Sequence, residues 1–164
     1  MQTDYIIREF ADGDAKAVLD IFNYFARESP AVYSETELGI EHIEQFIKSA
    51  RLFYVLISEE KVIGFGFVSP YKPFKNFSHT GVLTYFILPE YTGKGLGSDL
   101  FNHIIEEGKK IGITNYLAHI SSKNVQSLNF HKKHGFEEAG KFSNVGTKFG
   151  NYFDVIWVQK DYSL

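Results

Sequence analysis

The amino-acid sequence predicts a mixed α/β (α+β) domain, in which helices and strands are interspersed along one chain. Three observations support this class. Short runs rich in β-branched and aromatic residues recur along the chain, as strands require. Segments with apolar residues at helical spacing lie between these runs. The 164 residues match the size of one domain, so we expect a single domain over residues 1–164.

The composition narrows the range of partners. The net charge of −3 gives no basic excess, so we expect no nucleic-acid partner. The chain has no cysteine, which excludes disulfides, zinc–thiolate sites and a cysteine nucleophile. No apolar run approaches about 18 residues, and residues 1–16 lack the pattern of a signal peptide. We therefore expect a cytoplasmic protein without membrane contact.

The first half of the chain is expected to hold two helices and three strands. Asp14 is a preferred N-cap, and Pro30 follows the end of the helix that Asp14 opens. Residues 59–61 form the turn of a hairpin. In order, the expected elements are a strand at 5–10, a helix between Asp14 and Ser29, a short extended piece near Val32, a helix at 41–49, strands at 52–58 and 62–68, and a loop at 69–78.

The second half is expected to hold two helices and four strands. Ile111 is expected on the buried face of the first helix, and Gly112 closes that helix as a C-terminal glycine. In order, the expected elements are a strand at 83–88, a helix from Leu96 to Gly112, a strand at 115–120, a helix from Asn124 to His134, a strand at 136–142, a loop at 143–150 and a strand at 152–160.

The stretch from Leu83 to Leu100 joins a strand, a proline stop, a glycine-rich turn and the start of a helix. Glycines let backbone N–H groups approach a bulky anion, and the helix N-terminus adds a partial positive charge. This order predicts a phosphate site. The spacing of Gly93, Gly95 and Gly97 matches neither a P-loop nor a Rossmann fingerprint.

Two motifs carry a resemblance to the GNAT superfamily of N-acetyltransferases. The pattern P-x-x-T-G-K-G-L-G-x-x-L at residues 89–100 resembles the acetyl-CoA signature of that superfamily, with Thr92 where Gln or Arg is usual. The pattern N-x-x-S-x-x-F-H-x-K-x-G-F at residues 124–136 resembles its second motif. Residues 31–37 and 145–155 resemble the phosphinothricin and methionine sulfoximine acetyltransferase subgroup.

The resemblance implies a fold and a donor. It implies a mostly antiparallel, twisted central sheet with helices on both faces, and a pair of strands, 81–88 and 115–120, that splay apart around the pantetheine arm of CoA. It implies acetyl-CoA as the acyl donor and a homodimer. The residues that it assigns to acetyl-CoA are Phe86, Ile87, Leu88, Gly93, Lys94, Gly95, Leu96, Gly97, Ser98, Asn124, Ser127 and His131.

Two catalytic roles follow from the same resemblance. A backbone N–H at Ile87 or Leu88 is expected to stabilise the oxyanion of the tetrahedral intermediate. His131 is expected to protonate the leaving thiolate, because an imidazole pKa near ~6.5 suits that transfer at neutral pH. The alternative for the strand that carries Ile87 and Leu88 is an ordinary core strand, and the alternative for His131 is a surface histidine. His131 and His134 have no nearby carboxylate in the sequence, so we expect no metal.

The acceptor side departs from the subgroup. Val82 stands where the subgroup has a glutamate base, so water relayed to Glu35, His79 or His119 is the expected substitute. Lys72 and Phe74 stand where the subgroup has an arginine pair, which places activity on phosphinothricin in doubt. The residues expected to bind the acceptor are Tyr33, Glu35, Lys72 and His79.

The expected reaction is direct attack of a small-molecule primary amine on acetyl-CoA in a ternary complex. The first acceptor class is an amino acid or an analogue of one. Two alternatives stay open: an acetyltransferase for protein N-termini or lysine side chains, and a non-catalytic module that binds acyl-CoA.

Overall fold

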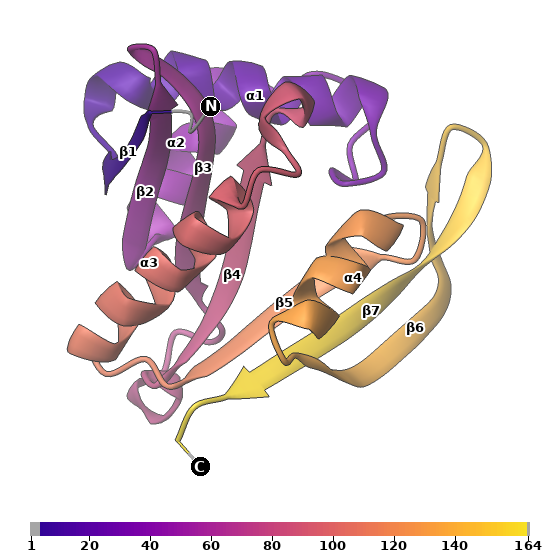
Figure 1. The fold of residues 1–164 in the computed structure, drawn as a ribbon. Coiled ribbons are helices and arrows are strands. Elements are labelled where there is room, and N and C mark those ends of the chain that lie inside the picture. Colours follow the sequence, from indigo (N-terminus) through magenta and orange to yellow (C-terminus); the bar gives the residue numbers. More distant parts are fainter. Residues whose placement is uncertain (1–3, 164) are drawn as a thin grey trace.

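The computed structural model describes residues 4–163 as one seven-stranded sheet with helices on both faces (Figure 1). The strands are β1 (Tyr5–Glu9), β2 (Leu52–Ser58), β3 (Lys61–Pro70), β4 (Thr80–Ile87), β5 (Asn115–Ser121), β6 (Glu137–Lys148) and β7 (Asn151–Asp161). The helices are α1 (Ala15–Glu28), α2 (Ile40–Ser49), α3 (Leu96–Lys110) and α4 (Val125–Lys133). The order across the sheet is β1-β2-β3-β4-β5-β7-β6.

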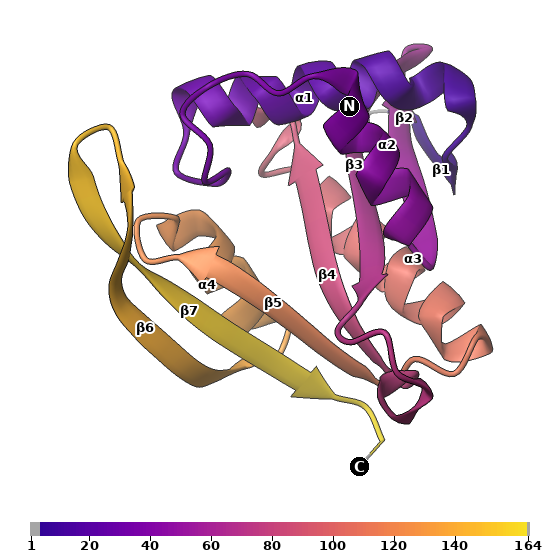
Figure 2. The ribbon, with the colours of Figure 1, turned by 180° about the vertical axis from the view of Figure 1, so that it is seen from behind.

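The two faces of the sheet carry different helices. Helices α3 and α4 cover the near face in Figure 1, and α1 and α2 cover the opposite face, which Figure 2 shows from behind. The core under α3 reaches from β2 to β7 and includes Leu100, Ile104 and Tyr116. The core under α1 is confined to the β2–β4 half and includes Val18 and Phe65. On the α1 and α2 face, the half made of β5, β7 and β6 therefore lacks a covering helix among residues 4–163.

The strands β4 and β5 form the parallel pair of this sheet, and they stay paired for only three residues. Their register ends at Val82 opposite Leu117, while β4 continues to Ile87 beside β3 and β5 continues to Ser121 beside β7. Beyond Leu117 the two strands diverge (Figures 1 and 2). The expected splayed pair and the mostly antiparallel sheet are both confirmed.

Most expected elements are confirmed, and five details need correction. Residues 143–148, expected as a loop, belong to β6, and a tight turn at Phe149–Gly150 joins β6 to β7 because both residues have positive φ. Ile111 lies beyond the end of α3 and is 45% exposed, so it does not join the core. No strand forms near Val32, and β3 continues to Pro70. The carboxylate of Asp14 accepts bonds from Arg8 and the Ala11 N–H instead of capping α1.

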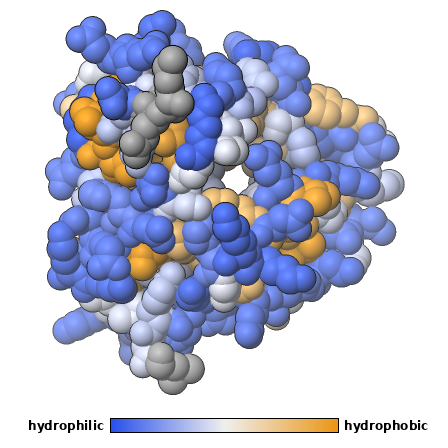
Figure 3. Space-filling view, in the orientation of Figure 1, coloured by the Kyte–Doolittle hydropathy of each residue, from blue (hydrophilic) through white to orange (hydrophobic). Residues whose placement is uncertain are grey.

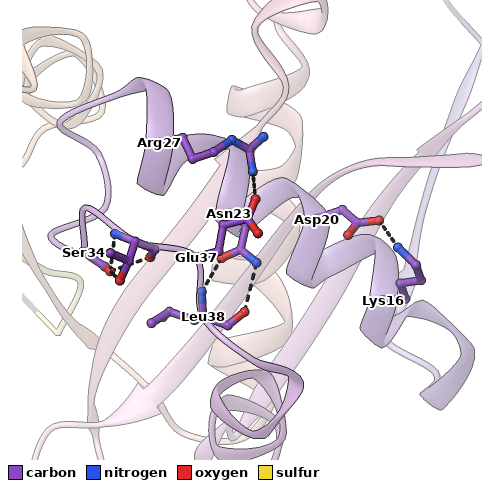
Figure 4. A network of polar contacts seen from close by, with 8 residues as sticks. Lys16, Asp20, Asn23, Arg27, Ser34, Glu37 and Leu38 are labelled. Atoms are coloured by element: carbon purple, nitrogen blue, oxygen red, sulfur yellow. Dashed lines mark hydrogen bonds and ion pairs between the residues drawn. The ribbon is translucent and has the colours of Figure 1, made fainter.

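The segment that joins α1 to α2 is fixed by buried polar contacts. The Asn23 side-chain amide donates to the Leu38 carbonyl at 3.0 Å and its oxygen accepts from the Leu38 N–H at 2.8 Å (Figure 4). The buried Lys148 ammonium on β6 donates to the carbonyls of Ser29 and Val32. Because buried polar groups are costly to leave unpaired, these bonds define the position of the segment that carries Tyr33.

Gly108 of α3 offers a test of the packing between α3 and β5. A Cβ atom at this position would lie 1.8 Å from the hydroxyl oxygen of the fully buried Tyr116. Overpacking costs about 1–3 kcal/mol, which exceeds the gain of up to about 1 kcal/mol from alanine in a helix. Gly108→Ala should therefore lower the free energy of unfolding, as measured by denaturant titration.

A second variant, Tyr116→Phe, tests whether the cost of Gly108→Ala comes from this clash. The Tyr116 hydroxyl is buried without a hydrogen-bond partner in the described chain, so Tyr116→Phe should be close to neutral or stabilising. In the Tyr116→Phe background the cost of Gly108→Ala should shrink, because the nearest ring carbon would lie at 3.1 Å. An equal cost in both backgrounds would contradict the clash.

Candidate active site

A cleft of about 730 Å³ passes through the sheet where β4 and β5 part. Its lining includes Phe25 from α1 and Phe46 from α2 on one face, and Gly95 before α3 and His131 of α4 on the other. Figure 3 shows the surface hollowed near the middle of the α3 and α4 face, with apolar side chains beside the opening. The cleft is therefore accessible to two ligands that approach from opposite faces.

The backbone of β4 presents polar groups to this cleft. In an antiparallel pair, alternate residues direct their N–H and C=O groups toward the partner strand and away from it. The Leu88 N–H donates to the Ile63 carbonyl on β3 at 2.9 Å, and the β3–β4 register is unbroken. The alternation therefore directs the N–H groups of Tyr85 and Ile87 into the gap. Of the two predicted oxyanion donors, Leu88 is already engaged, which leaves Ile87.

The glycine-rich turn precedes α3 on one face of the cleft. Gly93 and Gly95 have φ values of +74° and +84°, which a side chain would strain. Gly95 immediately precedes α3, so the turn brings its backbone to the N-terminus of a 15-residue helix. Gly97 lies close to the ring of Phe130, where a Cβ atom would be 3.3 Å from the ring edge. These features give the turn the geometry of an anion site.

Helix α4 brings Asn124, Ser127 and His131 to the same face. The Asn124 side-chain oxygen accepts from the Ser127 N–H at 3.2 Å, so Asn124 is the N-cap of α4, as expected. His131 lies one turn further on and is 3% exposed. Its Nδ1 donates to the Ser127 carbonyl at 2.7 Å, and the Tyr85 hydroxyl lies 2.9 Å from its Nε2. The ring is held at both nitrogens.

Burial changes the chemistry expected of His131. Desolvation lowers the pKa of His131 to about 4, so the imidazole is neutral at pH 7. Because Nδ1 carries the proton that the Ser127 carbonyl accepts, Nε2 accepts from the Tyr85 hydroxyl. Burial raises the pKa of Tyr85 well above its ordinary value, which keeps the phenol protonated. The expected role of His131 as a proton donor rested on a pKa near ~6.5, so its burial weighs against that role.

A second pair of side chains lies on the α1 and α2 face. The Tyr33 hydroxyl lies 2.8 Å from Nδ1 of His119 on β5, and the Tyr33 ring stacks on Phe153 at 5.5 Å. Desolvation raises the pKa of Tyr33 to about 12 and lowers the pKa of His119. Both groups line the cleft, where His119 is also in contact with solvent. At neutral pH the imidazole is therefore able to accept a proton.

The structure brings most of the predicted site residues together. The predicted residues that line the cleft are Tyr33, Phe86, Ile87, Gly93, Gly95, Gly97, Ser98, Asn124, Ser127 and His131. The Lys94 ammonium lies over the Tyr91 ring at 5.6 Å, outside the lining, and the side chain of Leu96 is buried in the core. Only the backbone of these two residues belongs to the glycine-rich turn.

Three of the four residues predicted to bind the acceptor lie outside the cleft. Glu35 accepts a hydrogen bond from the Phe149 N–H in the β6–β7 turn. Lys72 extends over the Tyr71 ring at 5.1 Å on an exposed loop. His79 is exposed just before β4, at the end of the sheet where β4 and β5 are still paired. The structure therefore does not bring these three residues to the cleft, and their role in binding the acceptor stays a prediction.

Two features were missed by the sequence reasoning. Tyr85 shares a face of β4 with Leu83 and Ile87, because side chains alternate along a strand. That alternation was readable in the sequence, but its contact with His131, 46 residues away, was not. The aromatic lining on the α1 and α2 face, contributed by both helices and two strands, was also missed.

The described residues give no support to a metal site or to a membrane-spanning helix. Among residues 4–163, no group of three His, Asp or Glu side chains is placed to hold a metal ion. Within the same range, no helix is both long and apolar enough to cross a membrane.

A strand gap that opens through the sheet, together with an anion site at a helix N-terminus beside it, defines the class of acyl-CoA-dependent N-acyltransferases. Comparison with known families agrees. The chain belongs to the acetyltransferase (GNAT) family, which matches residues 18–136. The family expected from the two motifs is confirmed, and the acyl donor is acetyl-CoA.

Several proteins that match this chain carry the names of the expected phosphinothricin and methionine sulfoximine acetyltransferase subgroup or of an amino-acid N-acyltransferase. The chain is 29% identical to the L-amino acid N-acyltransferase MnaT of Escherichia coli, over 93% of this chain and 91% of that protein. It is 28% identical to the L-methionine sulfoximine/L-methionine sulfone acetyltransferase of Salmonella typhimurium, over 92% and 91%. A phosphinothricin acetyltransferase structure from Sinorhizobium meliloti, in complex with AcCoA, shares the fold with a TM-score of 0.89, 21% identity and coverage of 99% and 89%.

The buried His131 predicts a loss of stability in acid. Its pKa is about 4 when folded and ~6.5 when unfolded, so the unfolded chain binds the extra proton between these values. Stability present above pH ~6.5 should therefore fall as the pH drops toward 4, by up to about 3 kcal/mol. Urea titrations at pH 7.5 and 4.5 should show a fall that is smaller by about 2–3 kcal/mol in His131→Gln than in the parent protein. An equal fall in both proteins would contradict a neutral, buried His131.

Proposed function

We propose that this chain transfers the acetyl group of acetyl-CoA to the primary amine of a small molecule, by direct attack in a ternary complex. The observation that carries the proposal is the parting of β4 and β5, which directs the Ile87 N–H into a cleft open to both faces. The anion site on one face suits the donor, and the second opening suits an acceptor. The amino-acid acceptors named for the relatives support a small amine as the acceptor class.

On the donor side, the backbone from Gly93 to Ser98 holds the pyrophosphate, and Asn124 and Ser127 border the arm that follows it. The arm lies along β4, where Phe86 and Ile87 line the gap. The Ile87 N–H donates to the thioester oxygen. This bond strengthens as negative charge develops on that oxygen in the tetrahedral intermediate.

On the acceptor side, His119 takes the proton of the attacking amine. If Nδ1–H donates to the Tyr33 oxygen, Nε2 is left as the proton acceptor. Tyr33 thereby orients the ring, as the third member of a catalytic triad orients a histidine. His119 is the one member of the predicted trio of base candidates that lines the cleft.

The amine nitrogen forms the new C–N bond to the thioester carbon while the carbonyl electron pair moves onto the oxygen. When the tetrahedral intermediate collapses, that pair re-forms the C=O bond and the C–S bond breaks, its electron pair leaving with the CoA sulfur. Tyr85 lines the cleft on the donor face and bears the O–H group nearest to His131. We assign to Tyr85 a hydrogen bond to the departing thiolate, for which its single O–H proton turns from Nε2 of His131 toward the sulfur. Before that step the hydrogen bond to His131 holds the Tyr85 side chain in place, so His131 is a positioning residue.

The assembly and location of the protein remain predictions. A homodimer is supported by large apolar side chains exposed on the β6–β7 hairpin, where Phe142 and Tyr152 are 62% and 66% exposed. The expected cytoplasmic location and the absence of a nucleic-acid partner rest on composition alone.

The direct experiment combines calorimetry with acetyl-CoA and a thiol-release assay over small amines, peptides with free N-termini and lysine peptides. Turnover on small amines supports the proposal. Turnover restricted to peptides favours a protein acetyltransferase, and binding without any turnover favours a non-catalytic module. Failure to bind acetyl-CoA would contradict the donor site itself.

Gly95→Ala tests the glycine-rich turn. Alanine at a φ of +84° is strained by about 1–3 kcal/mol, so the turn should shift and its N–H groups should lose their alignment. The Kd for acetyl-CoA should rise about tenfold or more, as measured by calorimetry. Gly140→Ala is the matched control, because no atom lies within 4 Å of its Cβ position and its φ is not positive. An unchanged Kd for Gly95→Ala would contradict backbone binding of the pyrophosphate at this turn.

His119→Gln tests the base. Loss of a general base lowers rates about 10²- to 10⁴-fold, so kcat/KM for an amine should fall about 10²-fold at pH 7. The deficit should shrink at high pH, where hydroxide can take the proton from the nitrogen of the tetrahedral intermediate in place of His119. The Kd for acetyl-CoA should stay unchanged, because His119 lies on the acceptor face. A pH-independent loss, or no loss, would contradict the assignment.

A further inference from the structure

The acceptor face of the cleft is lined by five phenylalanines whose rings contact one another. They are Phe22, Phe25, Phe46, Phe67 and Phe86. Phe86 lies 5.2 Å from Phe25 and 5.7 Å from Phe22, measured between ring centroids, and Phe46 lies 5.5 Å from Phe22. Three elements, α1, α2 and the β3–β4 pair, thus meet in one aromatic wall. Its half-buried members, Phe25, Phe46 and Phe86, present ring surface to the cleft.

Charge is nearly absent from this lining. Among the described residues that line the cleft, Lys133 is the one lysine, and there is no Asp, Glu or Arg. Lys133 belongs to α4, on the donor face (Figure 1). The polar groups near the aromatic wall include the neutral hydroxyls of Ser49, Ser69 and Thr84 and the Tyr33–His119 pair. An acidic group that enters this part of the cleft would lose water without gaining a cation.

The wall also suits an aromatic group on the amine. Val82 contributes an apolar side chain to the same face, on the strand that carries the Ile87 N–H. Aromatic rings pack against other rings edge to face or offset. An acceptor with an aromatic group could fill the wall and leave its amine beside His119. A short aliphatic amine would leave the wall unfilled.

We infer, resting on the proposed function, that the acceptor is a primary amine that carries an aromatic group, and that the site makes no ionic contact with a carboxylate. Aromatic amino acids and aromatic amines without a carboxylate share the chemistry that the wall recognises. The carboxylate of the former gains nothing, because the lining has no cation on the acceptor face. This selectivity is opposite to the one expected for an acidic acceptor such as phosphinothricin.

Steady-state thiol release at saturating acetyl-CoA tests the inference with four acceptors: 2-phenylethylamine, L-phenylalanine, propylamine and phosphinothricin. The expected kcat/KM for 2-phenylethylamine is at least tenfold higher than for propylamine or phosphinothricin, and no lower than for L-phenylalanine. A preference for phosphinothricin or propylamine would overturn the inference and leave acetyl transfer intact. If neither these four acceptors nor any other amine gave thiol release, the proposed function itself would be contradicted.

A charge-insertion variant sharpens the test. Ser69 shares a face of β3 with Phe67 and is half-buried at the cleft, so Ser69→Arg places a guanidinium on the acceptor face. The ratio of kcat/KM for L-phenylalanine to that for 2-phenylethylamine should rise about tenfold or more. Asn76→Arg adds the same charge on the exposed turn at Lys75–Phe77 and should leave the ratio unchanged. An unchanged ratio in Ser69→Arg, with acetyl-CoA affinity retained, would overturn the missing-cation argument.

A donor series excludes another occupant of the same wall. A longer acyl chain on CoA could also occupy an aromatic pocket beyond the thioester. The inference predicts that acetyl-CoA outperforms hexanoyl-CoA when 2-phenylethylamine is the acceptor. A preference for hexanoyl-CoA would assign the wall to the acyl chain and overturn the inference.

Discussion

The parting of β4 and β5 is the constraint on which the rest of the structure depends. Backbone N–H and C=O groups inside a sheet require partners, and an unpaired edge within a domain is costly unless something occupies it. Here β4 stays paired to β3 up to Ile87, and β5 stays paired to β7 up to Ser121. The unpaired groups therefore face each other across one gap. A ligand with an extended amide-containing arm could pair with β4 as a strand would, which supports the proposal that the break in the sheet is also the donor site.

The two faces of this gap differ because the two cores differ. The core under α3 crosses the sheet from β2 to β7 and ties both halves together, while the core under α1 stops at β4. The core under α3 consequently covers the donor face, except at the opening of the cleft that the glycine-rich turn and α4 line. The acceptor face leaves β5 uncovered, so Tyr33 and His119 meet at an opening next to the aromatic wall. The sheet thus separates the glycine-rich turn on one face from the aromatic wall on the other.

The sequence allowed the donor half to be predicted in detail but not the acceptor half. The donor half is local: a strand, a turn and a helix start are consecutive in the chain, and glycine spacing reports the backbone that they need. The acceptor half gathers α1, the segment with Tyr33, α2, β3 and β5, which are distant in sequence. Helical periodicity places Phe22 and Phe46 on the apolar faces of their helices, but it does not show that the two rings share a wall. Lys72 was chosen because it stands where the subgroup has an arginine pair, and His79 was chosen as a candidate base. The structure places Lys72 on an exposed loop and His79 at the end of the sheet where β4 and β5 are still paired.

The valine at position 82 fits the character of this site. A carboxylate there would hold an incoming amine as an ammonium ion, which is not nucleophilic. Apolar surroundings have the opposite effect, because desolvation disfavours the charged form and lowers the pKa of an amine. The neutral amine is then the species that enters most readily, and it needs a base only after the C–N bond begins to form. A weakly basic histidine is sufficient at that stage, since the nitrogen of the tetrahedral intermediate is far more acidic than the free amine. In the proposed mechanism, an apolar wall and the neutral imidazole of His119 thus take over the role that a carboxylate base has in the subgroup.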